Sequence, residues 1–257
     1  MLRDAIRSAT VTKPRLFFLG QAGFAIQNGR GKWLLIDPYF SDCVRRIEGN
    51  DGFKRLIPSP VTAEEMPCDV LVATHPHVDH FDVDSVPVLM ERGGRLFASV
   101  CCDSLVRDGG IDPDRVCYVR PGDRAEAEGF CLHFINCDHG EGAPDAVGVL
   151  VETDGIRLLF VGDTCLRPDR VSEYLSDGPL DLMAACINGK YGNMDYADCA
   201  RLTHALSPAL TVPCHFGMFA SHGGRPDLYY KTMTEDYPGH PFLFMAPGEE
   251  HLLKEEA

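Results

Sequence analysis

The sequence Val70-Leu-Val-Ala-Thr-His-Pro-His-Val-Asp-His80 is the most informative stretch of this chain, because it joins an apolar run directly to a cluster of polar side chains. The run over 70–73 is short and contains β-branched residues, which predicts a buried strand. Side chains at positions i and i+2 near a strand end point the same way. We therefore expect His75 and His77 to hold one metal ion.

Asp79 and His80 follow where the chain enters a loop, and we expect them to turn toward a second ion. The alternative is a polar loop with hydrogen-bonded histidines, which is the usual role of a single histidine. Four potential ligands within six residues, directly after an apolar strand, favour the metal site. Histidine and carboxylate ligands together suit zinc, manganese or iron.

Composition indicates one folded domain over 1–257. Hydrophobic residues make up 45% and charged residues 24% of the 257 residues, which is ordinary for a globular protein large enough to bury a full core. No linker and no change of composition separates two parts of the chain. The formal net charge of -14, with no run of Lys and Arg, argues against nucleic acid as a partner. A small anionic substrate is still compatible, since bound metal ions dominate the local field of a site.

The expected location is the cytoplasm, without attachment to a membrane. The N-terminal segment has no apolar signal core, and no stretch approaches the roughly 18 apolar residues of a membrane span. The 11 cysteines include no CxxC pair, which favours free thiols in a reducing compartment.

Hydrophobic patterns predict strands followed by alternating strands and helices, and this order occurs twice. Such a repeat indicates two sheets packed face to face with helices outside. After a short helical lead-in over 1–13, the first half is expected to contain strands at 15–19, 24–27, 33–36, 70–73 and 95–99, a helix at 82–91 capped by Asp82, and a helix near Ser104. The second half is expected to contain strands at 130–136, 146–153, 156–161, 180–187, 209–213 and 242–245, and helices at 169–176, 195–206 and 229–233. The loop-rich segment 38–67 is expected to wall one side of a pocket.

Three further potential ligands each follow an apolar run, which predicts that they lie at one edge of the sheets. They are His139, Asp163 in Val-Gly-Asp-Thr, and His215 in Val-Pro-Cys-His-Phe. The order of the whole set resembles the metallo-β-lactamase superfamily.

This resemblance implies an αβ/βα four-layer sandwich of the α/β class with two divalent metal ions, Mn2+ or Zn2+, between the sheets. It implies that the first ion is held by His75, His77 and His139. It implies that the second is held by Asp79, His80 and His215, with Asp163 bridging both. Asp37 matches an outer group that steadies a ligand.

Two bridged divalent ions lower the pKa of a shared water, so the expected activity is hydrolysis. Asp79 and Asp163 are the candidate catalytic carboxylates that orient the attacking water. The substrate is expected to be a small molecule with an ester, lactone, thioester, amide or phosphate ester bond. His77 differs from the Glu that is usual in flavo-diiron proteins. His80 differs from lactamases that have Arg at this position.

The segments 187–194 and 212–219 are similar to the L-ascorbate-6-phosphate lactonase family. This similarity implies opening of a sugar-acid phosphate lactone and therefore an anionic substrate. The chain departs from that family in being shorter, with a compressed interval around residues 190 and 191. The candidate substrate residues are Asn188, Lys190, Tyr191 and His222.

Alternatives stay open for both the residues and the function. The alternative for Asn188 is an Asn-Gly turn that only ends a strand, for Lys190 an exposed side chain, and for Tyr191 a packing role. The chain is otherwise expected to be a phosphodiesterase or thioesterase on the same scaffold, or a non-catalytic metal-binding protein. A homo-oligomer is compatible with the sequence.

Overall fold

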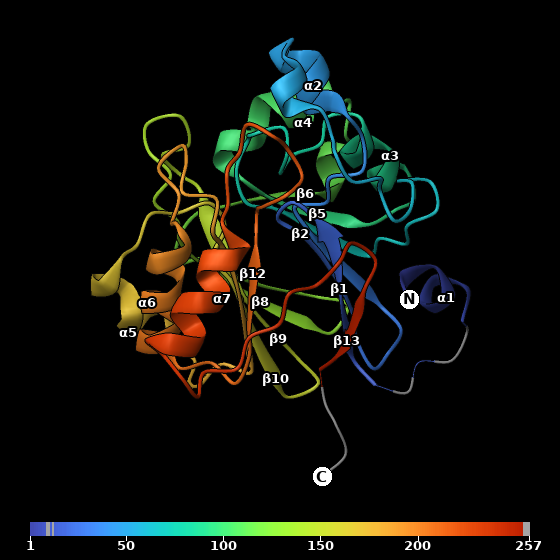
Figure 1. Ribbon diagram of the computed structural model, residues 1–257. Coiled ribbons are helices and arrows are strands. Elements are labelled where there is room, and N and C mark those ends of the chain that lie inside the picture. Colours follow the sequence, from blue (N-terminus) through green and yellow to red (C-terminus); the bar gives the residue numbers. More distant parts are fainter. Residues whose placement is uncertain (9–10, 12, 254–257) are drawn as a thin grey trace.

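The first of two sheets is built from the N-terminal half and closed by a C-terminal strand. The computed structural model describes residues 1–8, 11 and 13–253 (Figure 1). This sheet has seven strands in the order β13-β1-β2-β3-β4-β5-β6. Their bounds are β1 (Arg15–Gly20), β2 (Gly23–Gln27), β3 (Trp33–Ile36), β4 (Val70–Ala73), β5 (Arg95–Ser99), β6 (Val116–Val119) and β13 (Glu250–Leu252).

The second sheet has six strands in the order β12-β11-β10-β9-β8-β7. Its strands are β7 (Arg124–Ala127), β8 (Phe130–Asn136), β9 (Val147–Thr153), β10 (Ile156–Phe160), β11 (Leu182–Cys186) and β12 (Thr211–Cys214). Each half starts antiparallel, in β1 to β3 and in β7 to β10, and continues with parallel strands. The two halves therefore repeat one design, as the sequence pattern predicted.

Helices pack on the outer sides of both sheets (Figure 1). Three helices flank the second sheet, namely α5 (Val171–Tyr174), α6 (Tyr196–Leu206) and α7 (Pro226–Glu235). Three others pack beside the first sheet, namely α1 (Leu2–Arg7), α3 (Ser85–Glu91) and α4 (Asp103–Asp108). The connections contain the short α2 (Cys43–Glu48) and single 3-10 turns at Asp51–Phe53, Val100–Cys102, Pro113–Arg115 and Pro168–Arg170. Within the described ranges, no helix is long and apolar enough to cross a membrane.

The core between the sheets follows from alternation along each strand. In β1, Leu16 and Phe18 point toward the second sheet, and Phe17 points to the helices outside. Phe24 of β2 meets Phe160 of β10 across the interface, with ring centroids 5.3 Å apart. The central parallel strands β4 and β11 are buried along their whole length, which explains why they are continuously apolar. The predicted αβ/βα four-layer sandwich is confirmed.

The predicted last strand at 242–245 is wrong. Phe242 makes only an isolated bridge to Thr211, and the last strand is β13, which pairs with β1. Phe242 and Phe244 instead pack edge-on against Tyr229, with ring centroids 5.6 and 6.0 Å from the Tyr229 ring, whereas Leu243 and Met245 pack against the core between the sheets. An apolar run alone does not distinguish packing against a helix from pairing in a sheet.

The helix expected at 82–91 begins later, at Ser85. Asp82 accepts hydrogen bonds from the Ser85 amide at 3.2 Å and from the Phe40 and Ser41 amides at 2.9 and 2.8 Å. Asp82 therefore ties the preceding turn to the segment after β3. In place of the helix expected at 169–176, the chain forms the 3-10 turn Pro168–Arg170 followed by the one-turn α5. The cysteines are free thiols, as expected.

We predict that Phe134→Ala lowers the free energy of unfolding by about 3–5 kcal/mol, because it empties space between the sheets. Phe134 is fully buried there. Leu56→Ala is the control, since Leu56 is 57% exposed, and a change within about 0.5 kcal/mol is expected. Urea denaturation followed by circular dichroism measures both variants. Equal stability of the two would contradict this assignment of the core.

Candidate metal centre

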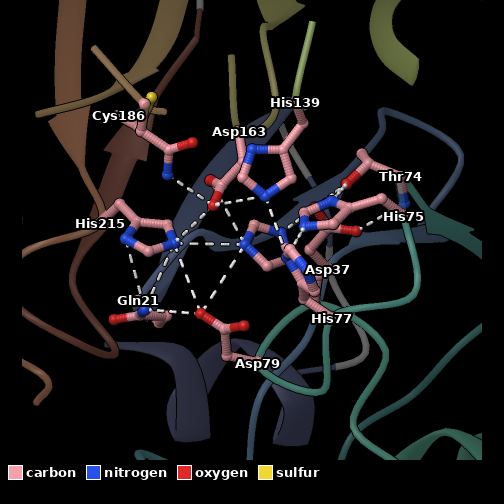
Figure 2. A network of polar contacts seen from close by, with 12 residues as sticks. Gln21, Asp37, Thr74, His75, His77, Asp79, His139, Asp163, Cys186 and His215 are labelled. Carbon is pink, nitrogen blue, oxygen red and sulfur yellow. Dashed lines mark hydrogen bonds and ion pairs between the residues drawn. The ribbon is translucent and has the colours of Figure 1, made fainter. Parts of the chain in front are cut away.

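Strand ends bring the polar side chains together at one edge of the sandwich. In each case an apolar strand stops and a polar residue follows within three positions. Figure 2 shows that these side chains point toward one another between the sheets. The residues are Gln21 after β1, Asp37 after β3, His75 after β4, His139 after β8, Asp163 after β10 and His215 after β12.

Three of these residues have left-handed backbone, which turns the chain sharply at the strand end. The φ angles are 56° at Gln21, 45° at Asp37 and 62° at His215. This conformation costs roughly 1–2 kcal/mol for a residue other than glycine. Local hydrogen bonds hold it, since the His215 amide donates to the Gln21 carbonyl at 2.6 Å and the Asp37 amide to the Val72 carbonyl at 3.0 Å. Such strain is typical of functional sites.

His75, His77 and His139 form the first ligand group. Their facing nitrogens are close, with 3.1 Å from His75 Nε2 to His77 Nδ1 and 2.9 Å from His139 Nε2 to the same atom. Tetrahedral ligands about 2.0–2.1 Å from zinc are separated by about 3.3 Å. The three nitrogens are thus spaced as ligands of one ion.

Asp79, His80 and His215 form the second group. His80 Nε2 lies 3.2 Å from His215 Nε2, and Asp79 Oδ2 lies 3.4 Å from His215 Nε2 and 3.8 Å from His80 Nε2. These separations also suit ligands of one ion, and all three side chains are buried. The tight turn that carries Asp79 and His80 is closed by a hydrogen bond from the His80 amide to the His77 carbonyl at 2.9 Å.

Asp163 lies between the two groups (Figure 2). Its Oδ2 is 3.1 Å from His215 Nε2 and 3.9 Å from His139 Nε2, and its Oδ1 is 3.3 Å from His80 Nε2. One carboxylate therefore reaches ligands of both groups. The donor set of imidazoles and carboxylates, in this arrangement, fits a pair of divalent ions of the zinc, manganese or iron type.

Asp37 and Thr74 orient His75 and His80 through hydrogen bonds on the side of each ring that faces away from the centre. Asp37 Oδ2 accepts from His80 Nδ1 at 2.7 Å and from the Thr74 hydroxyl at 2.6 Å, and Oδ1 accepts from the Thr74 amide at 2.8 Å. His75 Nδ1 lies 3.0 Å from the same hydroxyl. These bonds leave Nε2 of both imidazoles facing the centre, as a metal ligand requires.

Opposite charges stabilise the cluster when no metal is bound. Burial alone would lower the pKa of His215, but the Asp163 and Asp79 carboxylates outweigh it and raise that pKa to about 9. Burial also opposes ionisation of Asp163, yet His215 and His80 hold the pKa of this carboxyl well below its usual range. Burial lowers the pKa of His139 to about 4, so this imidazole is neutral and ready to bind a metal ion.

A cavity of about 390 Å³ opens above the cluster. Of the candidate substrate residues, Tyr191 and His222 line it, whereas Asn188 and Lys190 are not among its lining residues. Lys190 Nζ donates to the Ser221 carbonyl at 2.7 Å, and Asn188 Nδ2 lies 3.5 Å from the Lys190 carbonyl. The segment 38–67 walls one side of the cavity, as expected, through α2 and the turn after it.

Two polar residues of the site were missed by the sequence prediction. Gln21 Nε2 lies 2.8 Å from Asp79 Oδ2 and 2.8 Å from His222 Nδ1, and Asn193 Nδ2 donates to Asp163 Oδ2 at 2.7 Å. Gln21 carries the same signal as the ligands, because it follows an apolar strand. Asn193 belongs to the Gly-Asn-Met segment, whose partner across the site is distant in sequence.

The fold and the paired ligand groups define a protein of the metallo-β-lactamase type. Residues 32–216 match the family described as the beta-lactamase superfamily domain, and the chain belongs to that family. It is 26% identical over 252 residues to a metal-dependent hydrolase of Rubrobacter xylanophilus, which covers 92% of this chain and 95% of the relative.

Solved structures show the same fold. A metallo hydrolase from the archaeon Ignicoccus hospitalis superposes with a TM-score of 0.76 at 20% identity, covering 95% of this chain and 100% of that one. An isothiocyanate hydrolase from Delia radicum gut bacteria gives a TM-score of 0.74 at 20% identity, covering 92% of this chain and 98% of that one.

We predict that Asp37→Ala weakens metal binding by about 10–100-fold, because His80 and Thr74 lose the acceptor that orients them. Competition with a chromophoric chelator measures the affinity. Asp108→Ala is the control, since Asp108 is an exposed carboxylate at the end of α4. Equal affinity of Asp37→Ala and the unchanged chain would remove Asp37 from this role.

We predict that metal binding releases protons at neutral pH. Without metal, His215 holds a proton below a pKa of about 9, and a protonated imidazole cannot bind an ion. Affinity is therefore expected to fall as the pH falls. Calorimetric titration with Zn2+ in buffers of different ionisation enthalpy measures the proton release. A binding enthalpy that is independent of the buffer would contradict the protonation of His215.

Proposed function

We propose that this chain is a metal-dependent hydrolase that holds two divalent ions, Mn2+ or Zn2+. The first ligand group would hold one ion, the second group the other, and Asp163 would bridge them. Bound there, the ions supply Lewis acidity and lower the pKa of a water molecule. The observation that carries this proposal is the position of Asp163 between two three-ligand groups at the floor of an open cavity. The description of the Rubrobacter xylanophilus relative as a metal-dependent hydrolase agrees with it.

The residues of the cavity floor suggest how this chain acts on a substrate. Asp79 and Asp163 both line the cavity. Although burial opposes ionisation, the neighbouring histidines hold the pKa of both carboxyls well below the usual range, so each can accept a hydrogen bond from an attacking water. Gln21 and Asn193 donate to these carboxylates and limit their rotation. The chain thus orients the water and the reacting bond at a shared position.

A lactone is the substrate class that we propose first. The segment that is similar to ascorbate-6-phosphate lactonases contributes to the centre at several points. It supplies Asn193 beside Asp163 and His215 in the second group, and Phe219 packs edge-on against His222 with centroids 4.8 Å apart. L-ascorbate 6-phosphate is the specific compound that this similarity favours.

We predict that Asp163→Ala lowers kcat/KM by roughly 10²–10⁴-fold, as expected for loss of a carboxylate that positions the attacking water. Because both ligand groups contact Asp163, the metal content is also expected to fall below two equivalents per chain, as measured by elemental analysis. Asp169→Ala is the control, since Asp169 is an exposed carboxylate. Near-normal turnover in Asp163→Ala would remove this residue from the centre.

The assay is run on a panel of lactones, phosphodiesters and thioesters with added manganese or zinc. Metal-dependent hydrolysis of lactones supports the first substrate class. Cleavage of bis-(p-nitrophenyl) phosphate without lactone hydrolysis would instead identify a phosphodiesterase, and thioester cleavage alone a thioesterase. Bound metal without turnover of any of these compounds would favour a non-catalytic metal-binding protein.

A further inference from the structure

The cavity above the metal centre has two kinds of lining. Ligand side chains make up one part, and a set of apolar residues, here called the wall, makes up much of the rest. The wall is assembled from three separate segments, namely α2 with the turn after it, the loop after β4, and the loop after β11. Its apolar residues are Val44, Ile47, Phe53, Pro76, Val78 and Tyr191.

The wall carries no positive side chain. Apart from the ligand groups and His222, the charged residue among those that line the cavity is Glu48. His222 Nδ1 lies 2.8 Å from the side-chain amide nitrogen of Gln21, which donates to it. A phosphate or carboxylate away from the reacting bond would therefore meet Glu48 and no cation, and a desolvated charge without a partner is strongly unfavourable.

Four basic residues near the cavity have partners in the protein. Lys190 Nζ donates to the Ser221 carbonyl at 2.7 Å. Arg45 Nη2 lies 2.8 Å from the Asp51 carboxylate, and Arg46 is paired with Asp84 at 2.5 Å. Arg55 donates to the Ile57 and Tyr39 carbonyls at 2.8 Å each. None of these four side chains is among the lining residues.

Apolar surface at the cavity mouth is exposed. Ile47 is 48% exposed and Tyr191 is 56% exposed, although both are large hydrophobic residues. Phe53 packs edge-on against the His222 ring with centroids 5.6 Å apart, and Tyr191 approaches the same ring at 5.3 Å. A substrate group that covers this surface gains the hydrophobic contribution of every methylene it buries.

We propose that the substrate has no charge away from the cleaved bond and places an apolar group against the wall formed by Val44, Ile47 and Phe53. This inference rests on the proposed function, since the ions would hold the reacting group at the floor. It names the substrate class as neutral lactones or esters with an alkyl or aryl substituent. It replaces the anionic sugar phosphate that the sequence similarity favoured.

The test uses neutral metal-chelating probes, so that it does not depend on turnover. Alkyl hydroxamates from acetohydroxamate to octanohydroxamate are titrated into the zinc-loaded chain by calorimetry. Affinity is expected to rise about fourfold per methylene over the first few carbons, from the hydrophobic contribution of each methylene. Suberic acid monohydroxamate, which has a carboxylate at the far end, is expected to bind at least tenfold more weakly than octanohydroxamate.

Variants of Ile47 test whether the dependence of affinity on probe length and charge comes from the wall. Ile47→Ala is expected to lower the ratio of octanohydroxamate to acetohydroxamate affinity about fivefold or more, by removal of methylene contacts. Ile47→Lys is expected to reduce the difference in affinity between octanohydroxamate and suberic acid monohydroxamate. Leu56→Ala is the matched control, because Leu56 is 57% exposed and does not line the cavity, and it should leave both ratios unchanged.

The outcomes separate this inference from the proposed function. Affinity that is independent of chain length, or preference for the carboxylate probe, overturns the neutral substrate class and leaves the metal-dependent hydrolase standing. Equal effects of Ile47→Ala and Leu56→Ala also overturn it, since the apolar contact would then lie elsewhere. A chain that takes up neither zinc nor manganese overturns both proposals. Chain-length dependence without turnover of any ester, lactone, phosphodiester or thioester supports the apolar wall and contradicts the hydrolase.

Discussion

The hydrogen bonds of Asp37 are the interaction on which the centre depends. This one carboxylate, on the left-handed residue after β3, receives the amide and hydroxyl of Thr74 at the end of β4 and Nδ1 of His80. It thereby aligns two parallel strand ends and points His80 at the centre. The Thr74 carbonyl accepts from the Val147 amide at 3.0 Å, so the same residue also joins the first sheet to the second.

Burial and charge oppose each other throughout this edge of the sandwich. Imidazoles and carboxylates are packed where water is excluded, which is unfavourable unless they compensate one another. In the metal-free chain, protonated His215 and His80 balance Asp79 and Asp163. Divalent ions would take over this role, because they supply positive charge and accept the lone pairs that the histidines point inward.

Much of the architecture could be predicted from local patterns. Alternating strands such as β1 place Leu16 and Phe18 in one core and Phe17 in another, and this alternation is a property of extended backbone. Ligand candidates were found because each polar residue follows an apolar strand. The run at 242–245 misled the prediction, since its phenylalanines pack with Tyr229 and its backbone pairs with β12 at Thr211 alone.

Most of the strands, the division into two halves, and the type and position of the candidate ligands could be predicted from the sequence alone. These follow from short-range periodicity and from residue chemistry. Only the tertiary structure placed Asp163 between the two groups, Gln21 against Asp79 and Asn193 against Asp163. It also turned Lys190 away from the cavity toward Ser221. The reason is physical: strand ends distant in sequence meet only when two sheets pack, and the direction of a loop side chain depends on the partners it finds there.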